Sequence, residues 1–235
     1  MLDELFPVST PSLLDFESEA WLQGYTAVCG IDEAGRGPLA GPVVACALIL
    51  PNQPNITVED LPSEVNDSKK LSAKKRAKLL DIIQNIPDIA IGVGVCTAQE
   101  VDQHNILNAT HLAMKRAYEN LPQRSDFCLV DGLPVKGLAV DHQGIVKGDS
   151  RSYSIAAASI VAKETRDAMM IDYAKQFPEY SFEKHKGYGT KAHNEALQKH
   201  GPCEIHRYSF APVRLAAEKF NNKHNDNKES DYGLL

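Results

Sequence analysis

Short apolar runs alternate with stretches of helical periodicity along this chain. Four such runs, each bounded by Gly, Pro or Asp, predict strands: TAVCGID (26–32), VVACALIL (43–50), IAIGVGV (89–95) and FCLVDG (127–132). The first two are joined by the tight Gly-Pro-Leu-Ala-Gly-Pro connection, which indicates antiparallel neighbours.

The segments between and after these runs carry apolar residues at helical spacing. Leu79, Ile82, Ile83 and Ile86 recur at helical spacing after Ser72, which is a suitable N-cap residue. The same spacing covers residues 107–121, and an Ala-rich stretch over 155–170 predicts a helix that can lie close to a sheet. A last helix is predicted over 191–199, ending before Gly201-Pro202.

This order of elements predicts an α/β fold. We expect a mixed sheet of three antiparallel opening strands followed by parallel strands, with helices on both faces and a C-terminal helical segment. No internal repeat or long linker interrupts residues 25–220, which are taken as one domain. An irregular acidic extension (1–24) is expected before the domain, and a polar, disordered tail (221–235) after it.

Composition places the chain among ordinary globular proteins. Of its 235 residues, 43% are hydrophobic and 24% charged, which excludes a fibrous or wholly disordered chain. Five scattered cysteines without a Cys-x-x-Cys pair favour a reducing compartment and no structural zinc. No apolar run is long enough for a membrane span and no secretory signal is evident, so we expect a cytoplasmic protein without membrane association.

Net charge limits how nucleic acid could be bound. The formal charge of −6 arises mainly from the acidic extension, and basic and acidic residues balance within residues 25–220. Any nucleic-acid binding must therefore come from local basic patches.

Acidic residues follow three of the predicted strands. The pair Asp32-Glu33 ends the first run, Asp131 ends the run FCLV, and Asp149 ends a further predicted strand over residues 144–148. Ligand sites in α/β sheets commonly lie at strand ends, and clustered carboxylates need cations, of which Mg²⁺ or Mn²⁺ suit oxygen ligands. Local alternatives remain, because Asp131-Gly132 also suits a turn and Asp149-Ser150 a helix N-cap.

Two glycine-framed segments are candidate contact loops. Gly35, Arg36 and Gly37 follow the acidic pair, and flanking glycines allow close approach of backbone to a ligand. Tyr188 lies between two glycines beside Lys and His residues, a pattern that suits stacking on a sugar or base as well as an ordinary surface loop.

A basic run over residues 69–78 is the third candidate feature. Lys69 and Lys70 lie just before the predicted helix, where serines and lysines suit a phosphate, although a solvated helix face is the usual explanation of such a run. Together, a carboxylate metal site, two contact loops and a basic patch favour hydrolysis of a phosphodiester backbone.

Several long motifs resemble those of one enzyme family. The chain is similar to bacterial ribonuclease HII, in the type 2 ribonuclease H family, in these segments, which run in family order: GIDEAGRGPLAGPVV, NDSKKLS, NATHLAM, LVDG, KGDSRSYSIAAASIVAKETRD, HKGYGTKAH and HRYSFAPV. Gly-Arg-Gly favours type HII over HIII. The chain departs from the family pattern in its longer acidic extension and at Cys203-Glu204.

The resemblance implies a ribonuclease H-like fold with Asp32, Glu33, Asp131 and Asp149 as catalytic metal ligands for two Mg²⁺ or Mn²⁺ ions. It also implies that Gly35, Arg36 and Gly37 read a ribonucleotide 2′-hydroxyl, the group that distinguishes RNA from DNA. Tyr188 is implied to stack on the deoxyribose of the following nucleotide.

The implied activity is endonucleolytic cleavage of the RNA strand of RNA–DNA hybrids and of DNA duplexes on the 5′ side of embedded ribonucleotides, leaving 3′-hydroxyl and 5′-phosphate ends. A monomer is expected, and contact with a replication protein is left open. Two other functions stay open: a structure-specific DNA nuclease such as a junction resolvase, and an inactive hybrid-binding module.

Overall fold

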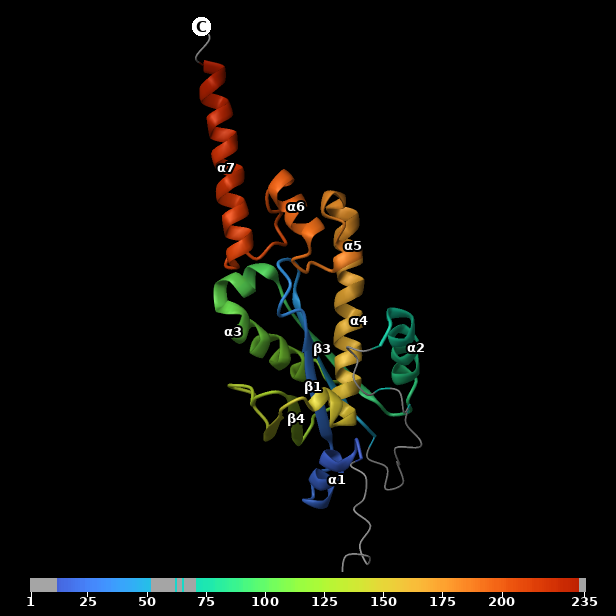
Figure 1. The fold of residues 1–235 in the computed structure, drawn as a ribbon. Coiled ribbons are helices and arrows are strands. Elements are labelled where there is room, and N and C mark those ends of the chain that lie inside the picture. The colour runs from blue at the N-terminus through green and yellow to red at the C-terminus, as the bar shows by residue number, and fades with distance from the viewer. Residues whose placement is uncertain (1–11, 52–61, 63–64, 66–70, 233–235) are drawn as a thin grey trace, which may run out of the picture. The chain divides into compact units, whose positions relative to one another are not determined.

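A computed structural model describes residues 12–51, 62, 65 and 71–232, and only the backbone of 223–232 (Figure 1). Its strands are β1 (Val28–Ala34), β2 (Val43–Ile49), β3 (Ala90–Cys96), β4 (Phe127–Asp131) and β5 (His142–Ile145). They form one mixed sheet in the order β3-β2-β1-β4-β5. All four predicted apolar runs are strands, which confirms the α/β prediction.

Seven α-helices and two short 3-10 helices are described along the same residues. The α-helices are α1 (Asp15–Leu22), α2 (Ala73–Gln84), α3 (Ala98–Glu119), α4 (Tyr153–Gln176), α5 (Phe182–His185), α6 (Lys191–His200) and α7 (Ala211–Tyr232). The 3-10 helices are η4 (Gly148–Ser150) and η5 (Pro178–Tyr180). Ser72 caps α2 by accepting a hydrogen bond from the Lys75 backbone, and α6 ends at His200 with Gly201 as its C-cap, as predicted.

The chain forms two compact units, and β1 passes from one to the other after Asp32. The first unit comprises residues 1–32, 48–91 and 122–160, and the second comprises residues 33–47, 92–121 and 161–235.

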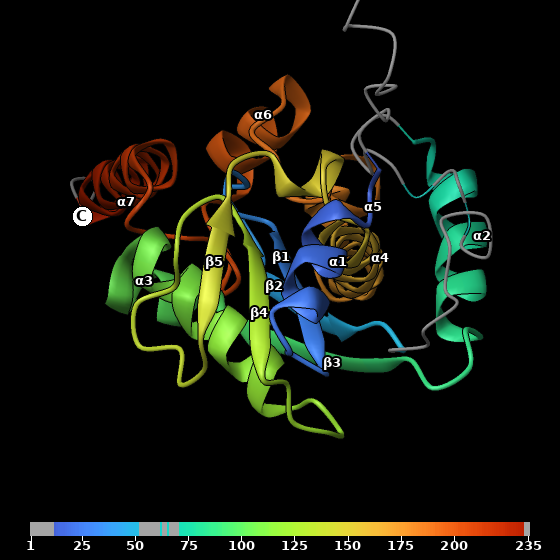
Figure 2. The same cartoon turned by 90° about the horizontal axis from the view of Figure 1, so that it is seen from below.

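Parallel pairing of β1, β4 and β5 organises the first unit (Figure 2). Its core contains Val28, Leu129, Ile145 and Ile155, all buried. Gly30 of β1 allows the start of α4 to approach closely, because a Cβ atom at this position would lie 2.2 Å from the Ser154 carbonyl carbon. The approach places the turn before α4 next to the ends of the parallel strands.

The N-terminal extension is not irregular throughout, contrary to prediction. Residues 15–22 form α1, which lies beside the start of α4 (Figure 2). Buried Glu17 accepts hydrogen bonds from the Ser152 and Ser154 hydroxyls and from the Ser154 backbone. The sequence signal was weak because α1 gains its stability from this tertiary contact and from Ala20 in the core, which local periodicity does not reveal.

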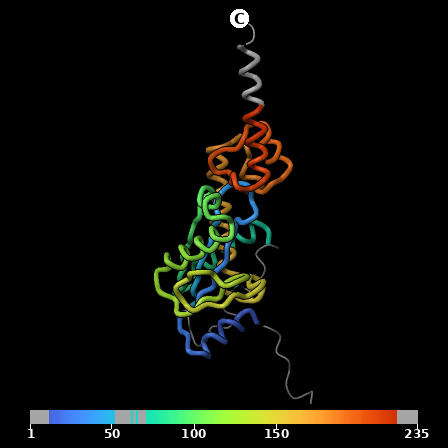
Figure 3. The backbone as a smooth tube through the Cα atoms, turned by 90° about the vertical axis from the view of Figure 1, so that its left-hand side faces the viewer, coloured from blue at the N-terminus to red at the C-terminus, as the bar shows by residue number. Residues whose placement is uncertain are grey.

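Helix α3 and the C-terminal helices build the second unit. The α3 helix starts with a capping box between Thr97 and Glu100, and it packs closely on Gly92 and Gly94 of β3. The α6 and α7 helices lie side by side (Figure 3), around a core that includes Tyr180, Phe182, Leu197 and Val213.

The tail from residue 221, predicted to be disordered, continues α7 as a helix to Tyr232. Extending an existing helix costs far less than nucleating a new one, so a polar sequence can remain helical when a packed segment precedes it. Within the described ranges, no helix is both long and apolar enough to cross a membrane.

Candidate active site

Asp32 and Asp131 occupy matched positions on adjacent strands. The parallel register pairs Ile31 of β1 with Val130 of β4, so the two aspartates come next on their strands. Neighbouring strands lie about 4.8 Å apart, and residues at matched positions point to the same face. Asp32 is 2% exposed and Asp131 is half-buried. The strand pairing alone therefore places these two residues on the same face of adjacent strands.

Asp149 reaches this region from a turn and not from the end of a strand, which corrects the prediction. β5 ends at Ile145, and Asp149 lies in η4 four residues later. Lys147 takes a left-handed conformation (φ 57°) that starts the turn, a backbone choice that apolar patterning does not reveal. No side-chain hydrogen bond caps η4, and α4 begins only at Tyr153.

A direct hydrogen bond links this turn to Asp131. The Gly148 N–H donates to Asp131 Oδ1 over 2.7 Å, which fixes the peptide next to Asp149 against the second carboxylate. Asp149 itself is 5% exposed. Gly148 also has no room for a side chain, since an added Cβ would lie 2.6 Å from Ile155 Cδ1. Tight packing thus positions η4 next to the end of β4.

Glu33, the fourth predicted acid, follows Asp32 at the start of the second unit. One of its carboxylate oxygens lies 3.3 Å from Arg36 Nη1, within hydrogen-bond distance. The Arg36 side chain is mainly exposed, whereas that of Glu33 is largely shielded from water. This contact connects the acidic pair with the Gly-Arg-Gly loop.

Asp32, Asp131 and Asp149 offer only oxygen donors, which is the ligand chemistry of Mg²⁺ and Mn²⁺. Among the residues that the structure describes, no three Asp, Glu, His or Cys side chains already have an arrangement that could hold a metal ion. Carboxylates repel one another, and they gather closely where cations offset that repulsion. The donor chemistry fits divalent cations of this class.

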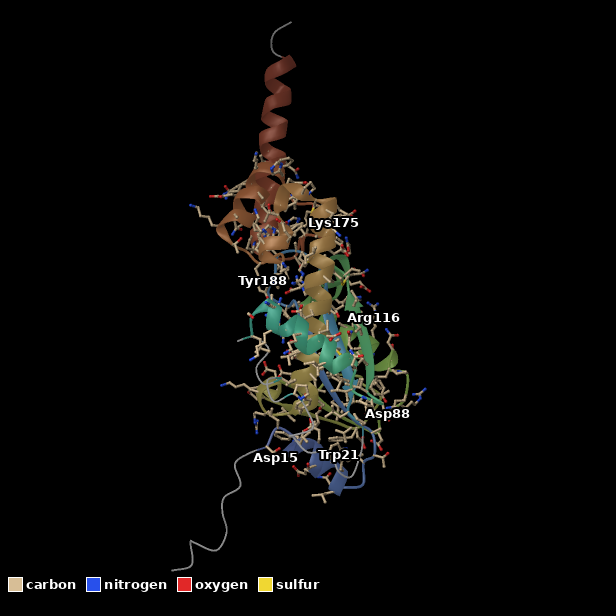
Figure 4. The ribbon with its side chains drawn as sticks, turned by 90° about the vertical axis from the view of Figure 1, so that its right-hand side faces the viewer. Asp15, Trp21, Asp88, Arg116, Lys175 and Tyr188 are labelled. Atoms are coloured by element: carbon tan, nitrogen blue, oxygen red, sulfur yellow. The ribbon has the colours of Figure 1, made fainter. Side chains whose placement is uncertain are left out.

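The two glycine-framed loops meet in the second unit. Gly187 accepts a hydrogen bond from the Leu39 N–H over 2.8 Å, and a Cβ on Gly187 would lie 2.4 Å from the Ala40 oxygen. Tyr188, labelled in Figure 4, is 45% exposed and its ring lies alongside Gly37. The structure thus brings Tyr188 next to Gly37, the last residue of the Gly-Arg-Gly loop of Gly35, Arg36 and Gly37.

Two buried arginines support these loops, and sequence reasoning assigned neither a role. Arg166 donates to the carbonyls of Ala40, Pro42 and Lys186. Arg207 donates to four carbonyls of residues 35–41. Burial lowers the pKa of Arg166 to about 10 and that of Arg207 to about 9. Both arginines lie in segments that match family motifs (KETRD and HRYSFAPV), and this match is the sequence signal that could have pointed to them.

A buried histidine pair holds the backbone of Tyr188. His193 Nδ1 lies 3.0 Å from the Tyr188 oxygen, and His193 Nε2 lies 3.0 Å from His206 Nε2. The Cys203 N–H donates to His206 Nδ1 over 2.9 Å. Because a carbonyl only accepts and an N–H only donates, His206 must donate to His193, and both rings are neutral. Desolvation lowers the pKa of His193 to about 4 and that of His206 to about 3.

Lys69 and Lys70, the predicted phosphate contacts, lie outside the described residues. The serine-capped start of α2 that follows them is present.

Comparison with known proteins agrees with the sequence motifs. The family model described as Ribonuclease HII matches residues 29–213. Ribonuclease HII of Syntrophotalea carbinolica is 51% identical over 211 residues, covering 90% of this chain and 98% of that protein. Ribonuclease HII of Chlamydia caviae is 50% identical over 199 residues, covering 85% and 91% of the two chains.

Solved structures show the same fold. The ribonuclease H2 of Pyrococcus horikoshii OT3 has a TM-score of 0.69 and 25% identity, and the match covers 83% of this chain and 99% of that one. Bst-RNase HIII in complex with Mn²⁺ has a TM-score of 0.63 at 18% identity, over 84% of this chain and 71% of that one, a likeness of fold alone.

These matches confirm the ribonuclease H-like fold that the sequence predicted. The chain belongs to the ribonuclease HII family, and it is an endoribonuclease of the type 2 ribonuclease H class that acts on nucleic acid.

Proposed function

We propose that this protein hydrolyses the RNA strand of RNA–DNA hybrids and nicks DNA duplexes on the 5′ side of embedded ribonucleotides. The products carry 3′-hydroxyl and 5′-phosphate ends. The observation that carries the proposal is the matched placement of Asp32 and Asp131 on adjacent parallel strands, with the Asp149 turn hydrogen-bonded to Asp131.

Asp32, Glu33, Asp131 and Asp149 would hold two Mg²⁺ or Mn²⁺ ions. Such ions, when bound, supply an activated water nucleophile and stabilise charge on the leaving 3′-oxygen. The protein's own part is to hold the carboxylates in place. The Gly148 N–H orients Asp131, and burial of Asp32 and Asp149 restricts their side chains. No side chain of the protein serves as the nucleophile.

The two glycine-framed loops select the substrate. Gly35, Arg36 and Gly37 contact the 2′-hydroxyl of the ribonucleotide, and the exposed ring of Tyr188 stacks on the next deoxyribose. The proximity of the Tyr188 ring to Gly37 supports one continuous binding surface that contacts two successive sugars of the substrate. Lys69 and Lys70 are proposed to contact phosphates of the duplex.

Asp131→Asn tests the catalytic assignment. Asparagine keeps an oxygen that can accept the Gly148 hydrogen bond but removes the charge needed for a cation. We expect cleavage of a duplex with one ribonucleotide to fall by at least about 10³-fold, the scale of losing one strong transition-state contact, with duplex binding retained.

Asp88→Asn is the matched control. Asp88 is exposed and has a φ of 59°, a conformation that asparagine also tolerates, so the same chemical change should leave cleavage intact. Full metal-dependent nicking by Asp131→Asn would remove Asp131 from the catalytic set.

A panel of labelled duplexes tests substrate choice in the same assay. Duplexes with no, one or four ribonucleotides and a four-way junction are incubated with and without Mg²⁺ or Mn²⁺. Cutting of the junction alone would favour a DNA resolvase, and binding without any cutting would favour an inactive hybrid-binding module.

Tyr188→Ala should slow cleavage of the duplex with one ribonucleotide, by roughly 10-fold if one stacking contact of about 1–3 kcal/mol is lost. Tyr188→Phe, which keeps the ring, should retain most of the activity. For Lys69 and Lys70, alanine variants should reduce the salt dependence of duplex affinity, and an unchanged dependence would leave them as a solvated helix face.

A further inference from the structure

The carbonyls of the Gly-Arg-Gly loop converge on one buried side chain. Arg207 is fully buried, and its guanidinium donates hydrogen bonds to the oxygens of Gly35 (2.6 Å), Arg36 (3.0 Å), Pro38 (2.9 Å) and Gly41 (3.0 Å). One planar group thus determines the direction of four backbone carbonyls within seven residues of chain.

The direction of these carbonyls also determines the direction of two N–H groups. In a trans peptide the C=O and the N–H of the same unit point in opposite directions, and no cis peptide occurs among the described residues. The Gly35 oxygen shares its peptide with the Arg36 N–H, and the Arg36 oxygen shares its peptide with the Gly37 N–H. Because Arg207 holds both oxygens inward, both N–H groups face away from it, on the side where Arg36 and Gly37 are exposed.

The positive charge of Arg207 should also strengthen these two N–H groups as hydrogen-bond donors. All the hydrogen bonds described for the Arg207 guanidinium go to backbone carbonyls, so its positive charge lies at the oxygen end of these peptide units. A cation there polarises the peptide, and linked hydrogen bonds in a low-dielectric interior strengthen one another. The N–H groups at the opposite end become better donors to an oxygen atom.

We propose that Arg207 is a positioning residue for ribonucleotide recognition: it aims the N–H groups of Arg36 and Gly37 at the 2′-oxygen of the substrate and strengthens them as donors. This inference rests on the proposed function and adds to it a buried residue that does not itself touch the nucleic acid. Arg207 acts only through the peptide units that it holds.

Arg166 is the matched comparison within the same unit. It is equally buried and also packs against Gly35, but it donates to the carbonyls of Ala40, Pro42 and Lys186 and to neither of the oxygens of Gly35 and Arg36. Replacement of either arginine by lysine removes a planar, multidentate donor and should lower the melting temperature. Because only Arg207 bonds to the oxygens of Gly35 and Arg36, Arg207→Lys should affect recognition of the 2′-oxygen more strongly than Arg166→Lys.

The experiment measures binding in an Asp131→Asn background and without added divalent metal, so that cleavage does not consume the substrate during the measurement. Dissociation constants are determined for a duplex with one ribonucleotide and for the same all-DNA duplex. We expect Arg207→Lys to reduce the preference for the ribonucleotide by about 10-fold, as for the loss of one good hydrogen bond to the substrate. Arg166→Lys should reduce the preference clearly less, because Arg166 bonds to neither of the two oxygens that orient these N–H groups.

The outcomes separate the two proposals. A parent protein with no preference for the ribonucleotide overturns the proposed function. A preference that persists in Arg207→Lys, or that falls equally in both lysine variants, overturns the role of Arg207 alone. A phosphate contact, in contrast, would weaken binding of both duplexes by the same factor and leave the ratio unchanged, which also overturns it.

A measurement on the chain with native Arg207 covers the case in which Arg207→Lys does not fold. The amide proton resonances of Arg36 and Gly37 are followed by NMR, again in the Asp131→Asn background. They should move downfield on addition of the duplex with one ribonucleotide and much less with the all-DNA duplex. Equal shifts with both duplexes, or none with either, would contradict the proposed direction of these N–H groups.

Discussion

Acidification is expected to destabilise this protein through the buried pair His193 and His206. The Cys203 N–H donates to His206, His206 donates to His193, and His193 donates to the Tyr188 carbonyl. A proton added to either ring would place two donors face to face. The folded state therefore keeps both rings neutral, and desolvation lowers their pKa values to about 4 and about 3.

The sign of the pH dependence follows from linkage. The pKa of an unfolded histidine is near 6.5, so the unfolded chain binds protons below this pH while the folded chain does not. The contribution to stability is fully present above pH 6.5 and is lost as the pH falls toward the folded pKa values. At pH 5, about 1.5 units below the unfolded pKa, each histidine contributes a loss of about 2 kcal/mol at 1.36 kcal/mol per unit, or about 4 kcal/mol for the pair.

Urea unfolding at pH 7 and pH 5 measures this loss. In the double variant His193→Gln, His206→Gln, the decrease in unfolding free energy between the two pH values should be smaller than in the parent by about 4 kcal/mol. His104→Gln is the control, because this side chain is exposed on α3 and should leave the decrease unchanged. An equal decrease in the parent and in the double variant would refute the assignment of neutral, proton-excluding rings.

Two further substitutions test the packing of the first unit. Glu17→Gln should raise the melting temperature at pH 8, by about 2–4 °C for each kcal/mol added to the free energy of unfolding. The reason is that burial raises the pKa of Glu17 and one of its carboxylate oxygens has no hydrogen-bond partner, so the charged form opposes folding. Because a raised carboxyl pKa makes stability greatest at low pH, the gain should vanish toward pH 4.5, and a less stable variant at pH 8 would contradict it. Gly30→Ala should cost about 3 kcal/mol in urea unfolding, because its Cβ would lie 2.2 Å from the Ser154 backbone, and a loss below about 0.5 kcal/mol would show that this contact is not close.

The strands and most helices could be predicted because their signals are local. The apolar runs that became β1 and β4 are short, bounded by turn residues and buried, and Ser72 and Gly201 mark helix ends by their own chemistry. The acids Asp32 and Asp131 could be predicted for the same reason, since each lies at or near the end of an apolar run.

Other features depended on contacts between distant residues. Helix α1 is anchored through Glu17 to serines about 135 positions later, and η4 is fixed by a left-handed residue and a hydrogen bond to Asp131. Nothing in the local pattern encodes such partners. The expectation of a strand ending at Asp149 therefore failed in detail, although Asp149 still lies next to the end of β4.

By itself, the sequence determined the α/β class and the family motifs, and through those motifs it named four candidate acids, because periodicity and motif spacing are properties of the linear chain. Only the tertiary structure decided which groups hold the two glycine-framed loops. Arg207 and the pair of neutral histidines act through buried hydrogen bonds to backbone atoms. A backbone carbonyl is the same in every residue, so its partner becomes known only when the folded chain brings the two together.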